Sequence, residues 1–240
     1  MKLLYVLCAA LGFCYAAAQE PPYVKKFSLN EILALNTGDT WKEFLNTSTM
    51  RAGVYNFKSN AQDAVKTAAE DGAYYIIKGK ATLNAGGENH TALAGNIFYI
   101  KGGSAYNFSA IESDLVVLVI YSKATPPADE KPFDTYNMAD IEQKRVPGEN
   151  AWEPFIRSKT MTYGLYMLPQ KTGGDSTLTH KMEELNYVTA GTSKFTVDDY
   201  TMDVTGGDIM YVDKGHGHYF HDLKSDFDVL IFWEKKSLQQ

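Results

Sequence analysis

The segment Trp41-Lys-Glu-Phe-Leu-Asn-Thr-Ser-Thr-Met50 returns as Trp152-Glu-Pro-Phe-Ile-Arg-Ser-Lys-Thr-Met161, an offset of 111 residues. Gly53-Val-Tyr-Asn-Phe57 returns at the same offset as Gly164-Leu-Tyr-Met-Leu168. Further along, Gly95-Asn-Ile-Phe-Tyr-Ile-Lys-Gly102 matches Gly207-Asp-Ile-Met-Tyr-Val-Asp-Lys214 at an offset of 112. A nearly constant offset over most of the chain indicates two copies of one structural unit.

The two copies lie at residues 25–124 and 138–236, and the segment 125–137 between them begins with a proline-rich run typical of a linker. Each copy consists of short runs of β-branched and aromatic residues between turn residues. One helix is expected, at 29–35. In the second copy we expect strands near 164–168, 185–189, 194–197, 208–212, 218–221 and 228–233. This spacing predicts an all-β fold of two sandwiches or barrels with few helices.

The composition is that of an ordinary folded chain. Among 240 residues, 45% are hydrophobic and 22% are charged, which excludes a disordered, collagenous or coiled-coil protein. The net charge of −6 disfavours nucleic acid and anionic membranes as partners, and leaves small molecules as the expected ones.

The first 18 residues are typical of a signal peptide. Lys2 precedes an apolar run, Ala16-Ala17-Ala18 forms a cleavage site, and the run is too short to span a bilayer. Both cysteines, Cys8 and Cys14, lie in this segment, so the mature chain contains no disulfide. We therefore expect a secreted glycoprotein, with three possible N-glycosylation sites at Asn46, Asn89 and Asn107.

Four of the five histidines lie in the second copy: His180, His216, His218 and His221. Residues four apart in a strand share a face, so His180 and Glu184 can point into one interior, and His218 can join them from a facing strand. Glu183 is then expected on the other face as a surface charge. We expect His216 on a solvated loop, His221 facing outward, and His90 of the first copy at the surface.

These residues fit two consecutive motifs, and the chain resembles the cupin family. The first motif comprises His180, Glu184, Tyr187, Val188 and Gly191, and the second comprises Gly207, Asp208, Gly215 and His218. The resemblance implies a bicupin of two tandem jelly-roll barrels. Two positions depart from the family pattern: Leu178 stands where a further histidine is common, and Asp213 stands where proline is usual.

The resemblance implies one divalent metal in the second barrel, held by His180, Glu184 and His218. Two imidazoles and one carboxylate favour Fe(II), and Mn(II), Ni(II) or Zn(II) fit the same donors. At the repeat offset, the first copy has Ala68, Gly72 and Tyr106 in place of these residues, so we expect no metal there.

The resemblance also implies inner-sphere chemistry on a small oxygen-bearing substrate chelated to the metal. Dioxygenase chemistry on an enol, phenol or small organic acid ranks above isomerase, lyase or decarboxylase chemistry. We expect Tyr166 to contribute a pocket hydroxyl. The alternative is a non-catalytic secreted protein that binds or stores a metal or ligand, because fold alone does not establish activity. A homodimer is a further expectation.

Overall fold

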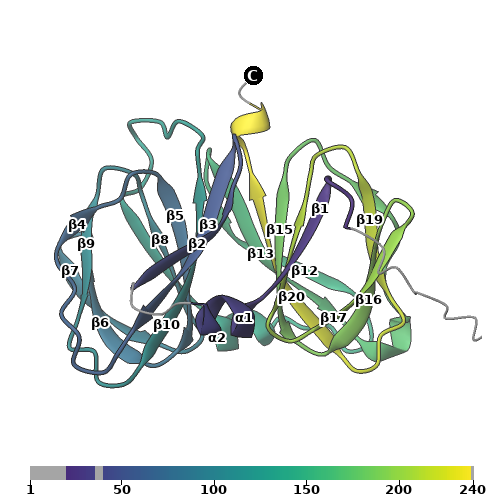
Figure 1. The fold of residues 1–240 in the computed structure, drawn as a ribbon, viewed down its shortest axis with the longest axis horizontal. Coiled ribbons are helices and arrows are strands. Elements are labelled where there is room, and N and C mark those ends of the chain that lie inside the picture. The colour runs from purple at the N-terminus through teal and green to yellow at the C-terminus, as the bar shows by residue number, and fades with distance from the viewer. Residues whose placement is uncertain (1–19, 36–39, 239–240) are drawn as a thin grey trace, which may run out of the picture.

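The structure is a computed structural model that describes residues 20–35 and 40–238. The expected signal peptide, residues 1–18, lies outside the described residues. Figure 1 shows two β-rich halves side by side, the first in blue and teal and the second in green and yellow. Within the described residues the α-helices are α1 (Leu29–Ala34) and α2 (Met138–Glu142), and both lie at the junction of the halves. The all-β prediction is confirmed, and α1 falls within one residue of the helix expected at 29–35.

The first half is built from a six-stranded and a four-stranded antiparallel sheet. Their orders are β11-β8-β5-β10-β3-β2 and β4-β9-β6-β7. The strands are β2 (Trp41–Asn46), β3 (Met50–Phe57), β4 (Lys66–Thr67), β5 (Asp71–Lys78), β6 (Lys80–Ala85), β7 (Glu88–Leu93), β8 (Asn96–Ile100), β9 (Ala105–Ser109), β10 (Leu115–Ser122) and β11 (Phe133–Asn137).

The second half repeats this arrangement with sheets β1-β18-β15-β20-β13-β12 and β14-β19-β16-β17. All the strands expected from the sequence are present, and shorter ones accompany them. The strands are β1 (Val24–Ser28), β12 (Ala151–Arg157), β13 (Met161–Leu168), β14 (Leu178–Thr179), β15 (Glu184–Ala190), β16 (Thr192–Val197), β17 (Tyr200–Thr205), β18 (Asp208–Val212), β19 (Gly217–His221) and β20 (Phe227–Glu234).

The two halves exchange their edge strands. Strand β1, which the repeat assigned to the first unit, pairs with β18 of the second half, and β11, which lies in the expected linker, pairs with β8 of the first. The exchange is reciprocal, since Leu29 N donates to Gly207 O at 3.0 Å and Met138 N donates to Gly95 O at 2.9 Å. An edge strand is held mainly by backbone hydrogen bonds, which any sequence offers, so the repeat pattern does not specify its partner sheet.

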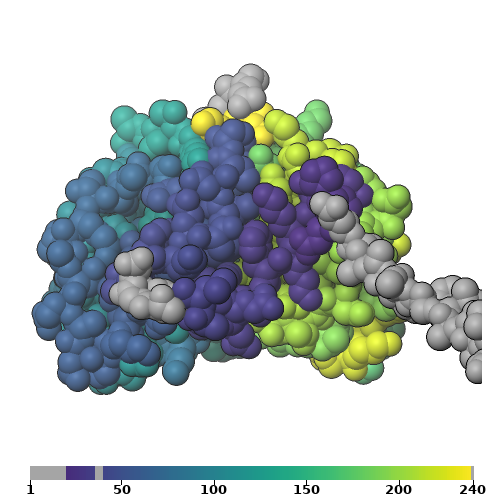
Figure 2. Space-filling model, in the orientation of Figure 1, coloured from purple at the N-terminus to yellow at the C-terminus, as the bar shows by residue number. Residues whose placement is uncertain are grey.

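The halves share a hydrophobic core. Each encloses its own cluster of buried residues, and a third cluster lies between the two six-stranded sheets, with Val54 and Leu118 from the first half and Leu165 and Leu230 from the second. The six-stranded sheets are therefore covered on both faces, which explains why every residue of β10 is buried. The space-filling view shows the purple N-terminal strand packed on the second half (Figure 2).

No helix among residues 20–35 and 40–238 combines the length and the hydropathy that a membrane span requires.

Candidate metal centre

The three predicted ligands converge at one end of the second barrel. Glu184 begins β15, His180 lies in the turn before it, and His218 comes from the facing strand β19. Glu184 Oε2 lies 3.4 Å from His180 Nε2 and 3.2 Å from His218 Nε2. The three candidate ligand atoms all lie within 4.8 Å of one another, the one such group of three found in the described part of the chain.

Two hydrogen bonds orient these side chains. Trp233 Nε1 on β20 donates to Glu184 Oε2 at 2.5 Å. His218 Nδ1 donates to the carbonyl oxygen of His216 at 3.1 Å, because a carbonyl can only accept. This bond leaves Nε2 of a neutral His218 with its lone pair directed toward Glu184. Such outer contacts fix ligand tautomers and ring orientations in metal sites.

The three side chains shift one another's pKa values. Burial alone would raise the pKa of Glu184, but the charge and hydrogen bond of His218 lower it to about 2. Burial alone would lower the pKa of His218, and Glu184 raises it instead to about 9. Burial lowers the pKa of His180 and outweighs the opposing charge of Glu184, and the neighbouring His218 lowers it further, so the neutral imidazole is favoured.

The donors fit a divalent metal. His180 Nε2 is buried and has no hydrogen-bond partner, although it faces a carboxylate. A buried polar atom without a partner is costly in a folded protein, and a coordinated cation would satisfy it. Two imidazoles and one carboxylate leave coordination positions open for other ligands.

An apolar pocket of about 200 Å³ lies next to these ligands. Trp233 connects the two, because its side chain lines the pocket and its Nε1 donates to Glu184. Its lining consists of Trp152, Tyr166, Leu178, Ile231 and Trp233. Leu178, at the position where a further histidine was considered, pairs in register with His218. The pocket therefore offers apolar surface to a small organic molecule beside the metal ligands.

The structure places Tyr166 in this pocket, on β13, with its hydroxyl bonded to Asp175. Burial, aided by the nearby Asp175, raises the pKa of Tyr166. The pKa of Asp175 is itself raised to about 6 by burial. Tyr166 is thus a neutral hydroxyl already engaged by a neighbour, and its role toward substrate stays a prediction.

The other singled-out residues lie outside the ligand group. His216 Nδ1 lies 2.6 Å from Asp198 Oδ2, and His221 Nε2 contacts Thr196 Oγ1 at 2.8 Å. The expectation that Glu183 is a surface charge is wrong. Glu183, just before β15, is 5% exposed and accepts hydrogen bonds from Thr47 and Thr49 of the first half, because this half rather than solvent covers the face opposite the metal ligands.

The three sequons differ in accessibility. Asn46 and Asn89 are exposed, whereas Asn107 is half-buried on β9. Asn107 Nδ2 donates to the carbonyl oxygen of Asp63 at 3.2 Å, and its Oδ1 accepts from Asn84 at 3.0 Å. The amide of Asn107 is therefore already used by the fold. His90, expected at the surface, is half-buried and stacks on Phe133.

The first half lacks the metal-ligand residues, and tyrosine side chains occupy the equivalent space. Strand pairing shows the correspondence between the halves. Gly72 lies opposite Tyr121 as Glu184 lies opposite Trp233. Tyr106 lies opposite Lys66 as His218 lies opposite Leu178. Ala68 occupies the place of His180 at the repeat offset.

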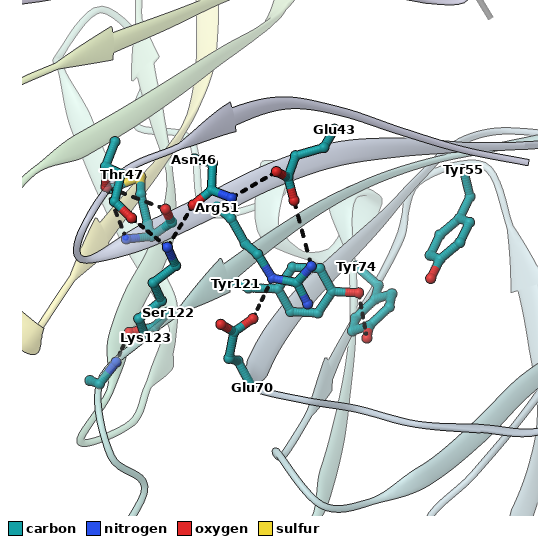
Figure 3. Close-up of polar contacts among 12 residues, drawn as sticks. Glu43, Asn46, Thr47, Arg51, Tyr55, Glu70, Tyr74, Tyr121, Ser122 and Lys123 are labelled. Carbon is teal, nitrogen blue, oxygen red and sulfur yellow. Dashed lines mark hydrogen bonds and ion pairs between the residues drawn. The ribbon is translucent and has the colours of Figure 1, made fainter. Parts of the chain in front are cut away.

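The tyrosines of this region form a bonded cluster. Tyr74 hydroxyl donates to Tyr121 hydroxyl at 3.3 Å, and the hydroxyls of Tyr55 and Tyr106 lie 3.2 Å apart. Figure 3 shows Tyr74 and Tyr121 joined, with the guanidinium of Arg51 over the Tyr121 ring. A Cβ atom at Gly72 would lie 2.8 Å from the Tyr74 ring, so a glutamate at that position has no room.

Sequence reasoning missed Trp233 as a partner of Glu184. A usable signal was present, because Trp233 aligns with Tyr121 at the repeat offset and both are aromatic. The pairing of Glu184 with Trp233 depends on the β15–β20 register, which includes an irregularity between Val188 and Ala190 that periodicity does not predict.

Comparison with known proteins agrees with this geometry. The sequence family described as "Cupin domain" matches residues 164–233, which include all three candidate ligands. An uncharacterized protein of Streptomyces coelicolor is 32% identical over 102 residues, which cover 41% of this chain and 96% of that protein. That relative therefore matches less than half of this duplicated chain.

Solved structures share the whole fold. Salicylate 1,2-dioxygenase from Pseudaminobacter salicylatoxidans superposes with a TM-score of 0.74 at 10% identity, covering 90% of this chain and 85% of that one. A cupin 2 conserved barrel domain protein from Leptotrichia buccalis gives 0.69 at 14% identity, with coverage of 88% and 96%. A putative glyoxylate-induced protein from Pseudomonas aeruginosa gives 0.70 at 12% identity, with coverage of 93% of both chains. The family match over residues 164–233 and the shared fold of these structures show that the second half is a cupin domain and that the whole chain has a cupin-type fold.

Proposed function

We propose that the protein is a single-metal cupin dioxygenase that acts on a small phenol or enol bound in the second barrel. The observation that carries this proposal is the convergence of His180, Glu184 and His218 beside an apolar pocket, with His180 Nε2 buried and unpartnered. Fe(II) is the favoured metal because this donor set is associated with oxygen-activating iron sites.

The protein's own residues have distinct roles in this proposal. His180, Glu184 and His218 would hold the metal, and Trp233 would keep the Glu184 carboxylate in place through its hydrogen bond. When bound, the metal supplies a Lewis acid with open positions for a chelating substrate and for dioxygen. The walls formed by Trp152 and Tyr166 would keep water away from the reacting molecule.

The pocket favours a planar, largely apolar substrate over a small aliphatic acid. Its lining offers indole, phenol and aliphatic surfaces, and no lysine or arginine that could neutralise a free carboxylate. The substrate's polar oxygens would then be satisfied by the metal. The shared fold with salicylate 1,2-dioxygenase, an enzyme named for an aromatic substrate, supports this choice.

Oxygen consumption tests the proposal. Protein loaded with Fe(II) without air is mixed with aerated buffer and a panel of catechols, hydroxybenzoates and enols. We expect substrate-dependent oxygen uptake by the wild type and a loss of at least about a hundredfold in Glu184→Gln, which keeps the size of the side chain and removes its charge. Full metal loading without uptake on any panel member would instead support the non-catalytic binding protein.

We further propose that the protein is secreted. The signal-type segment at residues 1–18 and the exposed sequons at Asn46 and Asn89 support this destination. Expression in a eukaryotic host, followed by N-terminal sequencing of protein from the medium, should give a chain that starts at Gln19. Retention of the whole chain inside the cells would contradict it.

A further inference from the structure

Asn186 is a buried polar residue that the metal centre does not use. It lies on β15 with 0% exposure, and neither its Nδ2 nor its Oδ1 has a hydrogen-bond partner among the described residues. A carboxamide has two donor hydrogens and an acceptor oxygen, and buried amides almost always use them. An amide left unpaired in a barrel interior indicates that something outside the chain bonds to it.

The position of Asn186 relates it to the metal centre. Residues two apart in a strand share a face, so Asn186 and Glu184 both point into the second barrel, with Cα atoms about 7 Å apart. On that face its registered neighbours are Met210 on β18 and Ile231 on β20, both apolar. Ile231 also lines the pocket beside the metal ligands. The amide is therefore a polar group in an otherwise apolar stretch of the interior, one strand away from the pocket wall.

The first half offers a comparison at the same position. Tyr74 pairs with Phe98 and Val119 as Asn186 pairs with Met210 and Ile231. Tyr74 is fully buried and packs against the rings of Tyr106 and Tyr121. Its hydroxyl donates to that of Tyr121 (Figure 3). The half without metal ligands thus fills this space with a bonded ring, whereas the half with the ligands has a smaller, unpaired amide.

We propose that Asn186 is a specificity-determining residue that hydrogen-bonds a hydroxyl or carbonyl group on the substrate. This inference rests on the proposed function, because it places a chelating pair of substrate oxygens at the metal and a further polar group of the substrate past the Ile231 wall, at the amide. The substrate class is accordingly a phenol or enol ring with a polar substituent away from its chelating edge. Asn186 offers both a donor and an acceptor to that substituent.

Salicylate and gentisate are a matched pair of probes. Both carry a carboxylate next to a hydroxyl, and gentisate has one more hydroxyl on the far part of the ring. Binding is measured calorimetrically to Zn(II)-loaded protein, in which no oxidation occurs. We expect wild-type protein to bind gentisate more tightly than salicylate by about tenfold or more, because a site built to bond a hydroxyl rejects the analogue that lacks it.

Asn186→Leu should abolish this preference while leaving the salicylate Kd and the zinc stoichiometry unchanged. The matched control is Tyr74→Phe in the first half, which should keep the wild-type preference. A second readout is the thermal midpoint: removing an unpaired buried amide should keep or raise Tm, because leucine needs no hydrogen bond. If Asn186 serves the fold through a buried water instead, Tm falls and no gentisate preference exists.

The outcomes separate this inference from the proposed function. Stoichiometric zinc binding with equal affinities for the two probes, or with binding of neither, overturns the role of Asn186 and leaves the metal centre standing. Failure of the wild type to bind zinc overturns the proposed function itself. A wild-type preference that survives in Asn186→Leu also overturns the inference, because another residue must then read the hydroxyl.

Discussion

Thr160 of the second half donates a hydrogen bond of 2.7 Å to the buried carboxylate of Asp71 in the first half. The repeat-related pair reproduces this contact in the opposite direction, since Thr49 Oγ1 lies 2.5 Å from Glu183 Oε2. The two halves are therefore joined by reciprocal threonine–carboxylate bonds at one end of their shared core. Each bond gives a buried carboxylate a hydrogen-bond partner. The junction between the halves therefore combines specific polar bonds with hydrophobic packing.

Thr160→Val should lower the free energy of unfolding by about 1.5–3 kcal/mol, because the hydrogen bond to the buried Asp71 carboxylate and the contact with Ser158 Oγ at 3.0 Å are lost at nearly constant volume. The Asp71 carboxylate would retain bonds from Tyr99 hydroxyl at 2.7 Å and Gly102 N at 2.7 Å. Urea denaturation measures the change. Thr67→Val, at an exposed position on β4, is the control and should change stability by less than about 0.5 kcal/mol. Equal effects of the two substitutions would show that the junction does not depend on this bond.

Trp233→Phe should weaken metal binding by about 10–100-fold without unfolding the protein, because outer hydrogen bonds hold the ligands in place. The substitution removes the indole donor to Glu184 and keeps an aromatic ring in the pocket. Competition with a chelator of known affinity gives the metal Kd. Trp152→Phe changes the same pocket without touching a ligand bond and should bind metal like the wild type. An unchanged metal Kd in Trp233→Phe would show that the indole hydrogen bond does not help to position Glu184 for metal binding.

Metal affinity should rise with pH between about 7 and 9. Glu184 overcomes the effect of burial and raises the pKa of His218 to about 9, so below that pH an incoming metal must displace a proton from His218. The logarithm of the binding constant should therefore increase by about one for each pH unit and level off above pH 9. Calorimetry in buffers of different ionisation enthalpy should show about one proton released per zinc ion at pH 7.5. A flat profile over this range would contradict the protonated state of the metal-free pair.

Glycans should occupy Asn46 and Asn89 and leave Asn107 free. Asn46 and Asn89 are exposed, and the bonds of the Asn46 amide to Glu43 and Lys123 lie at the surface, whereas Asn107 is half-buried on β9 and bonds to Asp63 and Asn84. Mass spectrometry of peptides from protein secreted by a eukaryotic host, deglycosylated in heavy-oxygen water, reports each site. A fully occupied Asn107 would require that the sugar is added before β9 takes its place in the sheet.

Much of the fold can be predicted from the sequence. The repeat is found by comparing the chain with itself, and strand periodicity depends only on neighbouring residues. The period-two pattern pointed Glu184 and Glu183 in opposite directions, and the structure agrees: Glu184, the first residue of β15, lies with the metal ligands, and Glu183 just before it faces the first half. The pattern could not show that the face of Glu183 is covered, because that depends on how the two halves pack. The exchange of β1 and β11 was unpredictable for a related reason, since edge pairing uses the backbone rather than side chains.

Some features of the candidate site could likewise be predicted from the sequence, and others could not. The spacing of His180, Glu184 and His218 within two motifs was enough to bring them together. The indole bond of Trp233 and the unpaired amide of Asn186 emerge only once the registers of β15 with β18 and β20 are fixed. Dimer formation stays a prediction, and sedimentation at micromolar concentration tests it.

The metal content of the purified protein is the sharpest test of a metal centre formed by His180, Glu184 and His218. Elemental analysis of native protein should find about one equivalent of a transition metal per chain, and Glu184→Gln should lose most of it, because one charged donor of three is gone. Less than about 0.1 equivalent in the native protein after incubation with Fe(II) or Zn(II), or the same content in both proteins, would contradict a metal centre formed by these three side chains.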